Sequence, residues 1–385
     1  MPSHALSAFP SRPSQALMGV LGVLAVWVVS GASSSAPVVV AAGASSLPAA
    51  VASDAPRSSS TAAPLKYRGV NFTHEGFRGR GGGYGSPAAR ASLARARELG
   101  VNAVAIVPYT FQRDTAVAAP FRVPSGMGGE SDERVTRVIR DAHARGLSVL
   151  LKPQIWVRRS WPGAIAMDTE DGWVRFFRYY GEWIQRYARL AQREGVEVLS
   201  VGVELQAASR RTAEWRALIA QVRAVYSGAL VYAANWYDEF DRVEFWDALD
   251  YVGVDAYFPL SEDADASDAE LAEGAERAAV RMAEVSARWH RPVLITEIGF
   301  GSTRAPWRMP HSSDGGAVAS PEDQARAYRA TTEALRNRRW LEGAFWWKWP
   351  SHGRVPSPED RGFSPLGKPA EAVLGAWFGS GGRQP

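Results

Sequence analysis

The chain contains no cysteine, and this absence excludes disulfide bonds, zinc sites with cysteine ligands and catalysis by a thiol. Its six histidines form neither an H-x-x-x-H nor an H-E-x-x-H pattern, so we predict no metal site. No motif requires a cofactor. The sequence therefore predicts an activity that needs neither a metal nor a cofactor.

Lysine is scarce, with only Lys66, Lys152, Lys348 and Lys368 in 385 residues. Most of the positive charge is arginine, and the formal net charge is +4. A run of five to eight lysines and arginines is typical of nucleic-acid patches, and this chain has no such run. We therefore expect no nucleic-acid partner.

The N-terminal part holds an apolar run at residues 16–29, followed by small residues. This run is shorter than the roughly 20 residues that a membrane helix needs. We predict a signal peptide over residues 1–36, with an uncleaved anchor as the alternative, and a disordered linker rich in Ser, Ala and Pro over residues 37–64. The protein is then expected to be secreted, periplasmic or held at the cell surface, without stable membrane insertion after processing.

Eight short apolar runs, rich in residues that favour strands, follow the linker. They cover residues 67–74, 101–111, 147–156, 197–206, 229–237, 251–260, 292–300 and 343–350. Most segments between them repeat apolar residues at helical spacing and end in Gly, and a last helix is expected at 369–378. This alternation predicts a single (β/α)₈ barrel over residues 65–380. A doubly wound sheet is the alternative, but eight runs with a helix after the last favour the barrel.

Two glutamates interrupt such apolar runs near their ends. Glu297 follows Val293–Thr296, and Glu204 ends the stretch "VGVE". Glutamate is rarely buried unless it is paired or has a chemical task. In a (β/α)₈ barrel the carboxyl ends of the strands surround the active site, so both side chains are expected there.

Two carboxylates across a barrel mouth suit the hydrolysis of glycosidic bonds. One protonates the leaving oxygen, and the other either attacks the sugar or activates water. A separation of about 5–5.5 Å gives retention of configuration, and about 6.5–9.5 Å gives inversion. The sequence leaves this separation open.

The segments "LKPQIW", "VGVEL", "YAANWYDEF", "DYVGVDAYFPL", "ITEIGF" and "FWWKW" together resemble glycoside hydrolase family 113, over most of residues 66–378. That family belongs to a clan of retaining (β/α)₈ glycoside hydrolases with catalytic glutamates on strands four and seven, and its members are chiefly endo-β-1,4-mannanases. The resemblance implies that Glu204 is the general acid/base and Glu297 the nucleophile. It also implies that Tyr257 hydrogen-bonds the nucleophile.

Further substrate-binding residues are expected around this pair, namely His74, Lys152, Asn235, Trp236, Trp347 and Trp349. Alternation along the last strand predicts that Trp347 and Trp349 share one face and Trp346 the other; we prefer Trp347 as the sugar platform. Trp161 and Trp307, in long loops, are expected to stack on outer sugars.

One position departs from the clan pattern. Most members have Asn directly before the acid/base, bonded to the sugar 2-hydroxyl, whereas this chain has Val203. We expect Asn235 or Lys152 to bind this hydroxyl instead. Mannose has an axial 2-hydroxyl, and an altered contact is compatible with it.

The leading hypothesis is a secreted retaining hydrolase of β-1,4-linked mannan or glucomannan, monomeric, with a polysaccharide or oligosaccharide substrate. One alternative is a hydrolase or transglycosylase of the same clan that acts on another β-glycan. Another is a barrel that binds carbohydrate without cleaving it. The first two hypotheses require the same two glutamates, so only a test of substrates distinguishes them.

Overall fold

The computed structural model describes residues 65–75, 81–124, 129–312, 318–357 and 359–379. The predicted signal peptide and linker lie outside these residues. Within them, the helices are all too short or too polar to cross a membrane.

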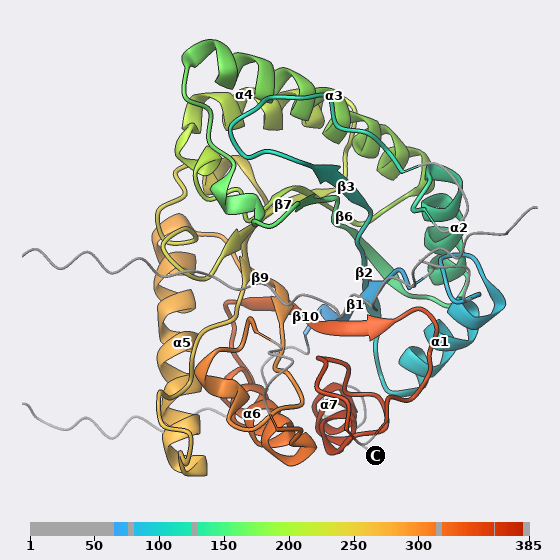
Figure 1. The fold of residues 1–385 in the computed structure, drawn as a ribbon, viewed down its shortest axis with the longest axis vertical. Coiled ribbons are helices and arrows are strands. Elements are labelled where there is room, and N and C mark those ends of the chain that lie inside the picture. Colours follow the sequence, from blue (N-terminus) through green and yellow to red (C-terminus); the bar gives the residue numbers. More distant parts are fainter. Residues whose placement is uncertain (1–64, 76–80, 125–128, 313–317, 358, 380–385) are drawn as a thin grey trace, which may run out of the picture.

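The strands close into a parallel barrel in the order β1-β10-β9-β8-β7-β6-β4-β2, and helices surround it (Figure 1). The barrel strands are β1 (Tyr67–Thr73), β2 (Ala103–Ile106), β4 (Ser148–Leu151), β6 (Val198–Val203), β7 (Ala229–Asn235), β8 (Tyr251–Asp255), β9 (Val293–Ile298) and β10 (Leu341–Pro350). The helices are α1 (Pro87–Glu98), α2 (Asp132–His143), α3 (Glu170–Glu194), α4 (Thr212–Arg223), α5 (Asp268–Trp289), α6 (Pro321–Ala334) and α7 (Pro369–Gly379). The predicted (β/α)₈ barrel is confirmed, and the doubly wound alternative is excluded because the sheet closes.

The strands are apolar on both faces because each face packs in a different core. A small inner cluster takes one or two residues from every barrel strand, with Phe345 at full burial. Gly69 makes room for it, since a Cβ atom there would lie 2.3 Å from the Phe345 ring. The larger cluster fills the space between the strands and the surrounding helices. This double burial explains why the runs read as continuous rather than alternating.

Two of the eight predicted runs are each divided into two strands. The run at 101–111 forms β2 and β3 (Tyr109–Gln112), and the run at 147–156 forms β4 and β5 (Gln154–Val157). Pro108 and Pro153 stand at the two breaks. Proline cannot donate a ladder hydrogen bond, so both strands leave the barrel there. β3 and β5 then pair with each other as a separate parallel sheet.

Strand register gathers polar residues at one end of the barrel. Asp255, the last residue of β8, pairs with Asn235 on β7 and with Glu297 on β9. The three residues therefore lie side by side at the carboxyl ends of consecutive strands.

Candidate active site

Glu204 directly follows β6 and turns the chain at the barrel mouth. Its φ of +50° lies in the left-handed region, which is uncommon for a residue with a side chain. Its N–H donates to the Ala233 carbonyl at 2.8 Å, so the residue stays tied to β7. Such backbone conformations concentrate at functional sites, where surrounding contacts maintain them.

Glu297 lies on β9 with 6% of its surface exposed. Lys152, fully buried at the end of β4, donates from Nζ to its Oε1. The Tyr257 hydroxyl, just after β8, donates to Oε2 at 2.7 Å. Each carboxylate oxygen thus accepts from its own donor, one of them a lysine. The predicted bond from Tyr257 to Glu297 is present.

An irregularity in β9 aims Glu297 at the barrel mouth. Leu294 faces the barrel interior, so strict alternation would point Glu297 outward. The pairing with β8 shifts by one residue between Ile295 and Glu297, which inserts an extra residue in β9. A bulge of this kind redirects the following side chain.

Glu204 has a different set of neighbours. Asn235 donates from Nδ2 to its Oε1 at 2.8 Å. Removal from bulk water and the nearby charge of Glu297 raise the pKa of Glu204 to about 7, against the opposing effects of the Asn235 bond and Lys152. A glutamic acid with this pKa retains its proton near neutral pH and can donate it, as a general acid requires.

Glu239 is a positioning residue that the sequence analysis missed. It is buried, accepts the Tyr232 hydroxyl at 2.6 Å, and accepts the N–H of Asn235 at 2.6 Å. It therefore fixes the residue that donates to Glu204. Glu239 lies in the stretch "WYDEF" after β7, where aromatic and acidic residues are mixed and the sequence does not distinguish a buried acid from a solvated one.

Asp255 was also missed. It is fully buried, and Thr296 donates to its Oδ1 at 2.7 Å, while no described residue hydrogen-bonds to Oδ2. Burial raises its pKa well above the ordinary range, and the charge of Lys152 opposes that effect. The signal was available: Asp255 ends the apolar stretch "YVGVD", as Glu204 and Glu297 end theirs.

The tryptophans of β10 do not follow the predicted alternation. Trp347 is partly exposed, and its ring centroid lies 5.6 Å from Lys152 Nζ, which places it at the cleft. Trp349 is fully buried and donates to Ser92 Oγ at 3.0 Å, so the prediction that it lines the cleft was wrong. The pairing of β1 with β10 shifts by one residue before Trp349, which turns this side chain outward.

The remaining predicted residues differ in exposure. Trp236, partly buried, lies 5.8 Å from the Phe258 ring, centroid to centroid. His74 is buried, and its Nδ1 accepts the Tyr84 N–H at 3.0 Å. Their contacts with sugar stay predictions. Trp307 is fully buried and donates to the Asp263 carbonyl, so the prediction that it stacks on an outer sugar was wrong.

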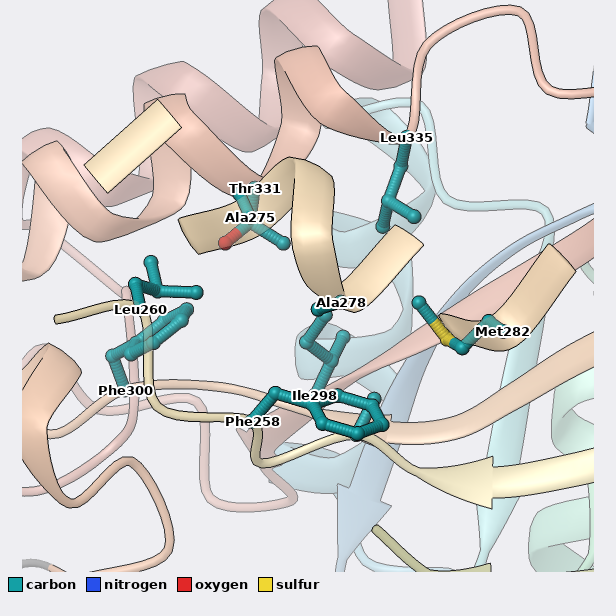
Figure 2. A pocket seen from close by; sticks show the side chains of 10 residues that line it. Phe258, Leu260, Ala275, Ala278, Met282, Ile298, Phe300, Thr331 and Leu335 are labelled. Atoms are coloured by element: carbon teal, nitrogen blue, oxygen red, sulfur yellow. The ribbon is translucent and has the colours of Figure 1, made fainter. Parts of the chain in front are cut away.

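A small apolar cavity lies on the helical side of the strands, between α5, α6 and the ends of β8 and β9. Figure 2 shows the side chains that line it, with Met282 and Ala278 on α5 and Leu335 following α6. Thr331 supplies the polar group of this lining. The cavity offers no pair of acids, so it is a packing feature of the helical layer.

In the part of the chain that the structure describes, no group of three or more acids and histidines is arranged to hold a metal.

The sequence model of glycoside hydrolase family 113 matches residues 72–368. A comparison with curated proteins gives no match. Among solved structures, a family 113 β-mannanase from Alicyclobacillus acidocaldarius is 28% identical, with a TM-score of 0.72, and the alignment covers 83% of this chain and 98% of that chain. A family 113 β-1,4-mannanase is 26% identical with a TM-score of 0.73, covering 82% of this chain and 99% of that one.

More distant structures share the fold alone. A family 5 mannosidase from Rhizomucor miehei is 14% identical with a TM-score of 0.52, covering 82% of this chain and 93% of that chain. The family match spans most of the barrel and includes both glutamates. It confirms the resemblance seen in the sequence, and the chain belongs to glycoside hydrolase family 113.

Proposed function

We propose that the protein hydrolyses β-1,4-linked mannan or glucomannan with retention of configuration. One observation carries the mechanism: two glutamates at the same barrel mouth have opposite surroundings. Glu297 receives hydrogen bonds from Lys152 and Tyr257, whereas the pKa of Glu204 is raised to about 7. This is the division of labour that a nucleophile and a general acid need.

In the first step, the Glu297 carboxylate attacks the anomeric carbon. The bond to the leaving oxygen breaks, and that oxygen takes the proton of Glu204. The product is a glycosyl ester of Glu297. In the second step, Glu204, now ionised, takes a proton from water, the water oxygen attacks the anomeric carbon, and Glu297 leaves as a carboxylate. Two inversions at one carbon give net retention.

The substrate assignment is supported by the similar solved structures described above, which are β-mannanases. The buried Val203 has no polar group for the sugar 2-hydroxyl. Asn235 and Lys152 lie at the catalytic pair and supply hydrogen-bond donors. An ammonium has three donors, so Lys152 can serve Glu297 and a hydroxyl together.

The test is hydrolysis of a panel of β-mannan, glucomannan, cellulose, xylan and galactan, with the anomer of the first product followed by NMR. We expect β-configured manno-oligosaccharides from the parent protein and none from Glu297→Ala. Products of α configuration would overturn the retaining mechanism. Cleavage of another glycan would replace the substrate, and binding without cleavage would favour a carbohydrate-binding barrel.

We also propose that the protein acts outside the cytoplasm. The support is the apolar run at 16–29 with small residues after it. The N-terminal residue of the protein recovered from the culture medium tests this. A start at or after residue 37 is expected, and retention of the whole chain in the cytoplasm would contradict the proposal.

A further inference from the structure

A two-stranded sheet lies beyond the carboxyl end of the barrel. β3 and β5 continue from β2 and β4 after one proline each, and they pair in parallel over four residues. Both strands alternate between a buried and a more exposed face. The buried face carries Thr110, Gln112, Ile155 and Val157, and the outer face carries Tyr109, Phe111, Gln154 and Trp156.

The outer face of β3–β5 exposes two large aromatic rings. Phe111 is 58% exposed and Trp156 is 53% exposed. The two residues are direct partners in the sheet, so their side chains project from the same face as neighbours. Contiguous exposed apolar groups on a folded protein usually mark an interaction site.

This face is continuous with the catalytic centre. The Tyr109 ring lies edge-on to the Trp156 ring, with centroids 6.5 Å apart. Tyr109 also packs against the inner cluster of the barrel, as Trp347 of the cleft does. Lys152, which bonds Glu297, precedes β5 by two residues. A chain that leaves the cleavage point along Tyr109 therefore reaches Phe111 and Trp156.

The chemistry of the face suits a sugar ring. One side of a pyranose presents C–H groups, which pack on an aromatic ring, while its hydroxyls extend sideways.

We propose that the outer face of β3–β5 binds a sugar unit of the substrate chain beyond those held at the catalytic pair, by stacking on Phe111 and Trp156. The proposal rests on the proposed function, because the sugar belongs to the same polysaccharide. It predicts a preference for longer chains.

The experiment compares the full-length parent with Phe111→Ala, Trp156→Ala and the matched control Val174→Ala, which removes an exposed apolar side chain (67%) from α3. The readout is kcat/KM on manno-oligosaccharides of three to six units. For the parent, kcat/KM is expected to increase with chain length. In each aromatic variant this increase is expected to be about tenfold smaller. Val174→Ala should keep it. Thermal unfolding establishes that the variants are folded.

An equal loss on short and long substrates, or an undiminished length effect, would overturn the proposal. A dimer of the parent that Trp156→Ala dissociates in sedimentation would overturn it too, and would make the face a contact between copies. If the parent cleaves no mannan, calorimetric titration with hexasaccharides of mannose, glucose and xylose separates the two ideas. If the parent binds one of them and Trp156→Ala binds it about tenfold more weakly, the aromatic face is a sugar site although the protein is not a mannanase. If both proteins bind equally, the aromatic face does not bind sugar.

Discussion

The ends of β6 and β9 carry the same residue type in opposite surroundings. At the end of β9, Glu297 accepts hydrogen bonds from Lys152 and Tyr257. At the end of β6, Glu204 accepts one from the neutral amide of Asn235 and feels the negative charges of Glu297 and Glu239. Donors stabilise a carboxylate, whereas burial near like charges stabilises the protonated acid.

The neighbours that create these different surroundings come from other strands. Lys152 directly follows β4 and Tyr257 follows β8, whereas Asn235 is the last residue of β7. None of these is adjacent in sequence to the glutamate that it serves.

Removal of Glu297 is expected to have the largest effect. Glu297→Ala should lower kcat by about 10⁵-fold, because no other described side chain takes the place of the nucleophile. The loss should be similar for mannan and for aryl mannosides with good leaving groups. Initial rates on both substrates measure it, and a variant that retains more than about 1% of kcat would contradict the assignment.

Removal of Glu204 should instead depend on the leaving group. Glu204→Ala is expected to lower kcat/KM on mannan by about 10²–10⁴-fold, since the leaving oxygen loses its proton donor. An aryl mannoside with an acidic phenol needs little protonation, so its first step should be largely retained. Pre-steady-state release of the phenol separates the steps. Equal losses on both substrates would place the acid elsewhere.

Lys152 acts on both glutamates: it donates to Glu297, and its charge acts on Glu204. Its removal therefore tests the surroundings of both residues. For the parent, kcat/KM should fall as the pH rises through about 7, where Glu204 loses its proton. The charge of Lys152 lowers the pKa of Glu204, so Lys152→Met should raise it and move the falling limb to higher pH. The same change should lower kcat by about 100-fold through Glu297.

The control for Lys152→Met is Lys66→Met. Lys66 pairs with Glu342 far from the catalytic glutamates, with 57% of its side chain exposed. Its pH profile should match that of the parent. A falling limb that stays in place in Lys152→Met would refute the electrostatic link to Glu204.

Glu130 extends the comparison to a buried acid with a single donor. Its Oε2 accepts the Tyr109 N–H at 2.7 Å, no described residue donates to Oε1, and burial raises its pKa to about 8. In the unfolded chain the Glu130 carboxyl ionises near pH 4.5. The stability that the protonated carboxyl contributes to the fold is therefore complete below that pH and is lost as the pH rises through about 8. Glu130→Gln should therefore raise the free energy of unfolding at pH 8 by about 2–4 kcal/mol.

Urea unfolding at pH 5 and pH 8 measures this effect. The exposed Glu133→Gln serves as the control, because its carboxylate stays in solvent. A Glu130→Gln protein whose stability keeps the pH dependence of the parent would show that Glu130 does not cause it.

The smallest effect is expected for a neutral group without a partner. Thr331 Oγ1 is buried at the apolar cavity of Figure 2, and no described residue bonds it. Thr331→Val should stabilise the fold by up to about 1 kcal/mol. Thr332→Val, which removes a bond to the Tyr328 carbonyl at 2.9 Å, is the matched control and should not stabilise. Thermal unfolding of both variants compares them.

Much of the site was predictable because acids in apolar runs are costly. The rule that located Glu204 and Glu297 also fits Asp255, and a search for aspartate would have found it. Glu239 gave no such signal, because its burial depends on Tyr232, Asn235 and the loop that encloses it. Local composition does not report burial that distant segments create.

The sequence by itself determined the alternation of strands and helices, the two acids at strand ends and the family to which they belong. These depend on periodicity and on residue types, which are local properties. Only the tertiary structure decided where the side chains point: extra residues in β9 and β10 turn Glu297 inward and Trp349 outward. Strand register depends on both neighbouring strands, so barrel closure decides which side chains reach the site.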